Sequence, residues 1–261
     1  MGGFSLCSSC VRQGLYGISF KLCLGGLAVL IDDNEILKIV LSDIQKVMKF
    51  SPYKKFVGIK NRQEFGELIA RDPAFGHLGL ADDRYLVARV GGNLVTSLHR
   101  KLGDMYERIF SYLLRETYNV AAEDVHYSVE VMIGDRVQLR STDGVIRPEN
   151  YGDMIPENWK NSEGIGFEVR SCYQIGDSKR IQADYDMALK LKAAGIVPVM
   201  LIMCATSLRS PVSRLAKSWD LYEGKQSFAL IQQLTGYDLA SFFTTNEKVI
   251  KAEMDKVLST F

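Results

Sequence analysis

Four segments between residues 137 and 204 decide the expected fold: VQLRSTDGVI (137–146), GIGFEVRS (164–171), SKRIQADYDMALKLKAAG (178–195) and IVPVMLIMC (196–204). The first two are strand-like runs, the third has the apolar spacing of a helix, and the fourth is almost wholly apolar. A strand, a helix and a second strand in succession predict parallel neighbours joined by a right-handed crossover. An apolar strand is typical of the buried centre of a sheet. We therefore expect an α/β fold with a mixed central sheet flanked by helices.

Two carboxylates stand out within the strand-like runs. Asp143 lies near the end of the first run, and Glu168 lies inside the second, two positions before Arg170. Because side chains alternate along a strand, Glu168 and Arg170 share one face, and Phe167 and Val169 share the other. If the two strands are neighbours, both carboxylates project into one space, where a hard divalent cation would relieve their repulsion. The pattern predicts a metal-dependent phosphodiesterase site.

Other readings of the same residues remain open. Asp143-Gly144 is also a common turn dipeptide, and Glu168 and Arg170 could form a solvated pair on one strand face. The helical run at 178–194 argues for a central strand at 165–171, where charges are costly without a purpose. The order of the residues together therefore favours a functional site over separate structural roles.

The chain before this region predicts helices and a hairpin. Helical spacing is found over residues 33–49, with Asp33 or Asn34 as the cap, and over 62–71 and 96–117. Residues 74–92 are dotted with glycine and predict irregular structure, with a short strand at 85–90. Strands at 125–133 and 136–146 would form a hairpin that turns at Gly134-Asp135.

The chain after residue 177 predicts further helices. Asp177 would cap a helix over 178–194 that ends at Gly195. The apolar stripe expected on that helix is Ile181, Tyr185, Ala188 and Leu189. Helices are also expected at 211–219, 223–234 and 246–259. We divide the chain into a mainly helical subregion, residues 1–92, and an α/β core with carboxyl-terminal helices, residues 93–261.

Glu107 is a third carboxylate of interest. It lies beside the apolar stripe of the helix at 96–117, in line with Phe110 and Leu114. A carboxylate among apolar neighbours is costly unless it has a partner. Glu107 is either a rim residue that pairs with Arg108 or Arg100, or a functional group.

Composition describes an ordinary folded protein. Hydrophobic residues make up 47% of the chain, which is enough for a sizeable core, and charged residues make up 24%. The net charge of +1 gives no overall attraction for nucleic acid, so binding to such a partner would depend on local clusters of basic residues. Five cysteines favour a reducing cytoplasm over a disulfide scaffold. The apolar run at 15–31 is interrupted by Lys21 and too short to span a bilayer, so no membrane partner is expected.

The order of elements from 96 to 204 is a helix with a glutamate, a hairpin, an aspartate, a strand with Glu-x-Arg, a helix and an apolar strand. This order resembles the PD-(D/E)xK nuclease superfamily, in particular type II restriction endonucleases. The resemblance implies that Asp143 and Glu168, with the carbonyl of Val169, bind Mg²⁺, for which Mn²⁺ can substitute. It implies that Glu107 assists them, that double-stranded DNA is the substrate, and that the protein is a homodimer.

Arg170 departs from the motif, which has lysine at this position. Arginine cannot lose its proton and so cannot be a general base, but it can hold a phosphate and offset its charge. Three explanations remain open: the enzyme works with arginine, the protein binds without cutting, or Lys179 supplies the amine. A catalytically silent DNA-binding relative is accordingly the alternative function, and a protein with purely structural carboxylates is a third.

Basic residues near the carboxylates are candidates for DNA contact, although any one of them could simply be solvated. A DNA-binding groove needs several of them to face one way. The candidates are Arg136, Arg140, Lys179, Arg209, Arg214 and Lys217.

Overall fold

A four-stranded sheet forms the centre of the protein. The computed structural model describes residues 21–24, 27–48, 53, 56–133, 136–174 and 178–259. The strand order is β5-β6-β7-β8, with bounds β5 (Gly144–Ile146), β6 (Gly164–Arg170), β7 (Ile196–Ile202) and β8 (Asp220–Glu223). β5 is antiparallel to β6, whereas β6, β7 and β8 are parallel. The expected mixed sheet and the parallel crossover are confirmed.

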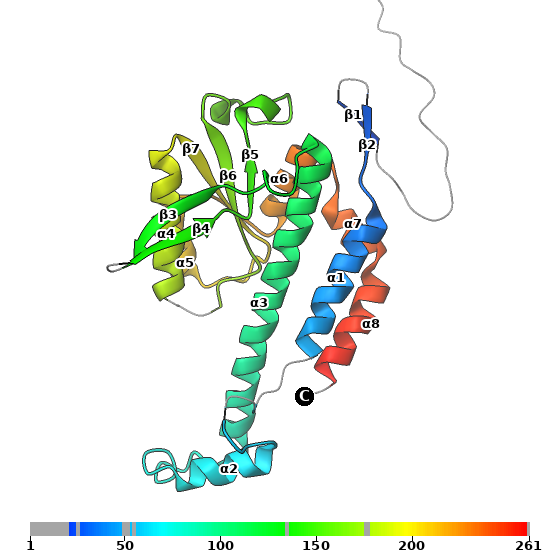
Figure 1. The fold of residues 1–261 in the computed structure, drawn as a ribbon. Coiled ribbons are helices and arrows are strands. Elements are labelled where there is room, and N and C mark those ends of the chain that lie inside the picture. Colours follow the sequence, from blue (N-terminus) through cyan, green and yellow to red (C-terminus); the bar gives the residue numbers. More distant parts are fainter. Residues whose placement is uncertain are drawn as a thin grey trace, which may run out of the picture.

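Helices cover both faces of this sheet (Figure 1). On one face lie α4 (Ser178–Ala193) and α5 (Arg209–Leu215), packed on Met200 and Ile202 of β7. On the other face lie α3 (Asp83–Tyr118) and α6 (Lys225–Thr235). The ring of Phe110 on α3 meets Phe167 of β6 edge-on, with centroids 5.0 Å apart. The alternation along β6 and β7 therefore builds one core on each side of the sheet.

The helix α3 is longer than predicted. It begins at Asp83, after Asp82, whose side chain accepts a hydrogen bond from the Arg84 amide. The irregular structure predicted for 74–92 is found over residues 74–82. From residue 83 that prediction and the strand at 85–90 are wrong, because this cap and the buried Leu86 and Leu94 extend the apolar stripe backward. Gly91 and Gly92 lower helix propensity without breaking the helix. α3 therefore runs across the division expected between residues 92 and 93.

The amino-terminal helices match their predicted positions. α1 (Asp33–Met48) buries Ile36, Val40, Ile44 and Val47, and α2 (Arg62–Arg71) is capped by the side chain of Asn61. The cap of α1 differs slightly, because the Asp32 carboxylate accepts from the Asn34 amide at 2.9 Å. β1 (Lys21–Leu24) and β2 (Leu27–Leu30) form an antiparallel pair. In the described part of the chain no helix is long and apolar enough to cross a membrane.

The predicted hairpin is present, but its second strand is divided. β3 (Ser128–Ile133) pairs with β4 (Arg136–Ser141), and β5 then joins the central sheet. The single strand predicted over 136–146 is wrong because the chain changes partner at its middle. The Thr142 amide donates to the carbonyl of Tyr127, the residue before β3, and the Asp143 amide donates to the carbonyl of Phe167 on β6. The turn at Gly134-Asp135 lies outside the described residues.

The carboxyl-terminal third holds two elements that were not predicted. These are the edge strand β8 and the short helix α7 (Leu239–Thr245), which precedes α8 (Glu247–Leu258). β8 reads DLYE and lacks the apolar run or alternation that marks a strand. α8 packs against α1, so the two ends of the described chain share one core (Figure 1). The connection from β5 to β6 contains only the short turns η1 (Pro148–Asn150) and η2 (Glu157–Trp159).

The buried stripe of α4 also differs from its prediction. Ile181 and Ala188 are buried as expected, but Leu189 is 47% exposed. Asp184 instead occupies the inward position between them. The prediction counted only apolar residues as inward-facing, and it therefore missed Asp184, whose carboxylate is paired with Arg170. Gly195 ends the segment with φ +73°, as expected, whereas the proposed cap Asp177 lies outside the described residues.

Candidate active site

Asp143 lies where the chain passes from the hairpin into the central sheet. Its Oδ2 accepts a hydrogen bond from the Val169 amide at 2.7 Å, so the carboxylate caps the end of the β5–β6 ladder. In that ladder Gly144 pairs with Phe167, and each step toward lower numbers on β5 raises the β6 number by one. One step beyond Gly144, Asp143 therefore stands opposite Glu168. The predicted meeting of the two positions is supported by this register.

Glu168 and Arg170 face α4, while Phe167 and Val169 face α3. Glu168 is 6% exposed, and the Arg170 side chain is 14% exposed. Charges at this depth are costly unless they are paired. The alternative of a solvated surface pair is therefore wrong for these two residues.

The guanidinium of Arg170 connects the cluster. Its Nη1 lies 3.4 Å from Asp143 Oδ2 and donates to the Val169 carbonyl at 3.0 Å. Its Nη2 forms an ion pair with Glu168 and donates to Asp184 Oδ1 at 2.7 Å. All three groups expected to bind Mg²⁺ thus contact one internal cation. In the described residues no three His, Cys, Asp or Glu side chains form a metal-binding group.

The cluster holds more negative than positive charge. Asp143, Glu168 and Asp184 are three buried carboxylates around one guanidinium. Burial raises the pKa of Asp143, although Arg170 and the Val169 amide oppose this. Burial alone would lower the pKa of Arg170, but the charges of Asp184 and Asp143 raise it above its usual range. The arginine is therefore firmly charged, and the carboxylates can accept further positive charge.

Glu107 approaches the cluster from α3. Burial, followed by the negative charge of Asp143, raises the pKa of Glu107 to about 7, while Arg170 opposes this. Glu107 lines a separate cavity of about 330 Å³ together with Arg108 and His126. The His126 Nδ1 lies 2.7 Å from the Thr142 carbonyl, directly before Asp143. Glu107 is thus electrostatically linked to Asp143 and takes up or releases its proton near neutral pH.

Asp184 and Tyr173 are site residues that the sequence analysis missed. Asp184 Oδ2 accepts a hydrogen bond from the Tyr173 hydroxyl at 2.6 Å, and its carbonyl accepts from Trp219 Nε1 at 2.9 Å. These bonds fix Asp184 against Arg170. The signal that could have found it is the spacing of Ile181, Asp184, Ala188 and Leu191, which is that of one buried helix stripe with a carboxylate in it.

A cavity of about 270 Å³ opens onto the cluster between the hairpin and α4. Its lining comprises Gln138, Arg140, Ser141, Glu168, Arg170, Asp184 and Met187. Arg140 is the residue among the six DNA-contact candidates that lines it. The cavity therefore brings one predicted DNA-contact residue to Glu168 and Arg170.

The other DNA-contact candidates whose side chains the structure describes do not line this cavity. Arg209 pairs with Glu223 at 2.9 Å, and Arg214 donates to Gln182 at 3.0 Å. Lys179 and Lys217 are exposed on the α4 and α5 side, and the Arg136 side chain lies outside the described residues. Lys179 does not line the cavity, so its expected role as a substitute amine gains no support.

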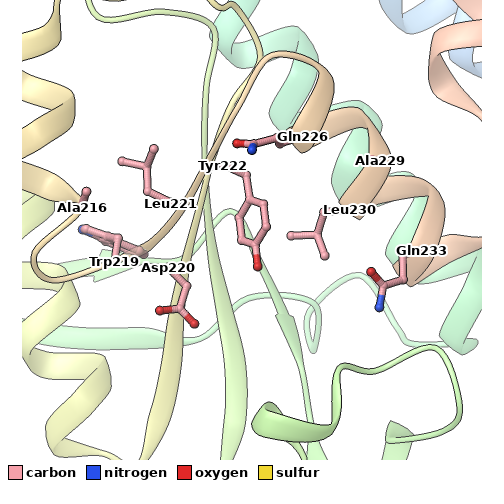
Figure 2. A pocket seen from close by; sticks show the side chains of 9 residues that line it. All are labelled: Ala216, Trp219, Asp220, Leu221, Tyr222, Gln226, Ala229, Leu230 and Gln233. Atoms are coloured by element: carbon pink, nitrogen blue, oxygen red, sulfur yellow. The ribbon is translucent and has the colours of Figure 1, made fainter.

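A larger cavity of about 630 Å³ lies at the other edge of the sheet. Figure 2 shows its lining, which comes from α6, from β8 and from the turn before β8. Its carboxylate Asp220 accepts a hydrogen bond from Trp159 Nε1 at 3.0 Å. Glutamine, leucine and aromatic side chains dominate the remainder, so this cavity lacks the paired acidic groups of the smaller one.

Comparison of the chain with protein-family models, with curated proteins and with solved structures finds no match. The geometry of the carboxylate cluster therefore carries the functional argument.

Proposed function

We propose that the protein is a Mg²⁺-dependent endonuclease that hydrolyses phosphodiester bonds of double-stranded DNA in the manner of a type II restriction enzyme. The observation that carries the proposal is the opposition of Asp143 and Glu168 across β5 and β6, beside Arg170 and a cavity open to the hairpin. The element order α3, β3–β4, β5, β6, α4, β7 is compatible with a restriction-endonuclease-like fold.

The donor chemistry fits the metal. Mg²⁺ prefers carboxylate and carbonyl oxygens, which Asp143, Glu168 and Val169 provide. The surplus of buried negative charge around Arg170 favours a second cation, with Mn²⁺ as a replacement for Mg²⁺. Because Arg170 contacts all three groups, metal binding requires it to release them while Asp184 retains it. When bound, the metal supplies activation of water and neutralisation of phosphate charge.

The remaining side chains of the cluster have separate roles in the proposal. Arg170 stays protonated, so it orients the scissile phosphate and offsets its developing charge. Asp184 and Tyr173 hold Arg170 in place. Glu107, whose pKa of about 7 lies near the working pH, accepts or returns a proton beside Asp143.

DNA would approach the cavity side of the cluster. Arg140 would contact a phosphate there, and Arg136, Lys179, Arg209, Arg214 and Lys217 would extend the contact along the hairpin and α4–α5. Recognition of a palindromic site would require a two-fold homodimer. The proposed location is the cytoplasm, where the DNA substrate is accessible.

A catalytically silent DNA-binding protein is the second candidate. It is favoured by one observation, that Arg170 engages Asp143, Glu168 and the Val169 carbonyl at once. In such a protein the guanidinium would permanently replace the metal. DNA would then bind through Arg140 and its neighbours without being cut.

Incubation of the purified protein with supercoiled plasmid separates these functions. Discrete fragments in Mg²⁺ or Mn²⁺, lost in EDTA, are expected of the nuclease. Asp143→Asn and Glu168→Gln should abolish cleavage, whereas Asp153→Asn, an exposed carboxylate in the β5–β6 connection, should cut normally. A shifted but intact plasmid favours the silent protein. A plasmid that is neither cut nor shifted would contradict both candidate functions.

A further inference from the structure

Two cysteines lie opposite each other just beyond the carboxyl ends of β6 and β7. In the parallel pairing each β6 residue faces the β7 residue whose number is 32 higher, from Gly164 and Ile196 to Arg170 and Ile202. The Met203 amide donates to Arg170 at 2.8 Å and the Cys204 amide to Ser171 at 3.0 Å, which carries the strands on together. The same offset places Cys172 opposite Cys204. Directly paired positions on neighbouring strands have the Cα separation that a disulfide requires.

A single hydroxyl group lies between the two thiols. Ser207 Oγ lies 3.4 Å from Cys204 Sγ and 3.6 Å from Cys172 Sγ, and it also accepts a hydrogen bond from the Tyr173 amide. The Gln174 side chain donates to Cys172 Sγ at 3.5 Å. Both cysteines are half-buried, so neither is sealed in the core. Both thiols therefore contact the same hydroxyl group, which places their sulfur atoms close to each other.

The two thiols differ in acidity. Burial raises the pKa of the Cys172 thiol, and its bond to Cys204 adds to this rise. Burial acts in the same direction on Cys204, but hydrogen bonds from Cys172, Ser207 and Thr206 together outweigh it and lower the pKa of the Cys204 thiol. The more acidic thiol of a pair is the one expected to attack, and the less acidic thiol then resolves the product.

We propose that Cys172 and Cys204 form a redox-active dithiol that hydrogen peroxide converts into a disulfide. The Cys204 thiolate attacks one peroxide oxygen, the O–O bond breaks, and the departing hydroxide takes up a proton to become water. The Cys172 thiol then attacks the sulfenic sulfur of Cys204, forming the S–S bond and releasing a second water. Two thiols are oxidised by two electrons and one peroxide is reduced to two waters.

This site is independent of the proposed nuclease activity, although it lies beside the carboxylate cluster. Cys172 is followed by Tyr173, whose hydroxyl holds Asp184, and the closed segment 172–204 contains the whole of α4. Oxidation would therefore tie together the ends of the two strands that carry Arg170 and Ile202. The inference rests on the positions and acidities of the two thiols and on no property of the carboxylates, so it can fail or hold independently of the nuclease proposal.

Peptide mapping of the full-length protein tests the proposal. After peroxide treatment in EDTA, free thiols are alkylated and the protein is digested with trypsin without reductant. Cleavage after Arg170, Lys179, Lys192 and Arg209 places Cys172 in peptide 171–179 and Cys204 in peptide 193–209, each without another cysteine. The expected product is these two peptides joined, with the loss of two hydrogen atoms, and separated again by dithiothreitol. Alkylated thiols in both peptides, or disulfides to Cys7, Cys10 or Cys23, would overturn the proposal.

Single substitutions test the order of attack. In Cys172→Ser, Cys204 should stop at the sulfenic acid and react with dimedone. In Cys204→Ser, Cys172 should oxidise at least about tenfold more slowly, since it lacks thiolate character. Ser207→Ala should slow disulfide formation several-fold, while Ser213→Ala, an exposed residue on α5, should not. Equal oxidation of Cys172 with and without Cys204 would contradict the assignment of Cys204 as the attacking thiol.

Discussion

Asp184 on α4 is buried and accepts a 2.7 Å hydrogen bond from Arg170 on β6, whose side chain is 14% exposed. The carboxylate is itself fixed from the other side by the Tyr173 hydroxyl. An ion pair thus joins α4 to β6, and the Tyr173 hydroxyl holds the carboxylate of that pair in position. Such support is expected around a side chain whose position matters, and it holds the Arg170 guanidinium against α4.

Asp184→Asn should destabilise the fold and disturb Arg170. The amide keeps the shape but weakens the charge-assisted hydrogen bonds that Asp184 accepts from Arg170 and Tyr173, which costs about 1–3 kcal/mol of the free energy of unfolding. Urea denaturation measures this loss, and Asp186→Asn, on the same helix with an exposed partner, should change little. Tyr173→Phe should cost about 1 kcal/mol and be non-additive with Asp184→Asn. Fully additive losses would show that the two residues act separately.

Arg170→Lys should lower plasmid cleavage about tenfold or more, as expected when a charged hydrogen bond is lost. One ammonium cannot reach Asp184 and the Asp143 side of the cluster in the way that a two-pronged guanidinium does. Initial rates in Mg²⁺ provide the measurement, with Arg89→Lys, an exposed position on α3, as the matched control. A faster enzyme would mean that arginine is the impairment and that the motif lysine restores function.

Stability in EDTA should fall as the pH rises from about 4.5 to about 7, because of Glu107. Its pKa is raised in the folded protein, chiefly by burial and then by Asp143, so the folded state holds the proton longer than the unfolded state does. The contribution of protonated Glu107 to the free energy of unfolding is therefore complete below about pH 4.5 and lost above about pH 7. After allowance for solvent screening of a half-buried group, the loss is on the order of 1 kcal/mol. Glu107→Gln should flatten this part of the profile, and an unchanged slope would contradict the assignment.

Much of the fold could be predicted from the residues. The period-two and apolar runs located β6 and β7, and the helical spacing located α1, α2 and α4, because these elements bury a continuous stripe or face. The opposition of Asp143 and Glu168 was a hypothesis about neighbouring strands, and the β5–β6 register supports it. Alternation alone was enough to place Glu168 and Arg170 on one face.

What could not be predicted depends on contacts between distant residues. The helical spacing places Asp184 on the inward stripe of α4, but its partners Arg170 and Tyr173 come from the end of a different element and could not be read from that spacing. β8 has no strand pattern of its own and exists because β7 offers it a free edge. The break between β4 and β5 follows from a change of hydrogen-bond partner at Thr142 and Asp143, which leaves no local mark in the sequence.

Gly144→Ala should disrupt the placement of Asp143. A Cβ at Gly144 would lie 2.7 Å from Leu114 Cδ1 and 3.1 Å from a Phe110 ring atom, both in the packed core beneath β5. The overpacking should cost about 1–3 kcal/mol, measured by urea denaturation. Gly152→Ala, where an added Cβ meets nothing within 4 Å, is the matched control. Equal stability of the two variants would show that β5 is not packed closely on α3.

The central claim is that Asp143 and Glu168 serve as joint oxygen ligands of one divalent cation, and Mn²⁺ binding measured by calorimetry tests it most directly. The wild type should bind Mn²⁺, Asp143→Asn and Glu168→Gln should each weaken binding about tenfold or more, and the double variant should be little worse than either. The control variant Glu149→Gln replaces an exposed carboxylate of η1, between β5 and β6, and should bind Mn²⁺ normally. Undiminished binding in both single variants, or no binding by the wild type, would contradict the claim.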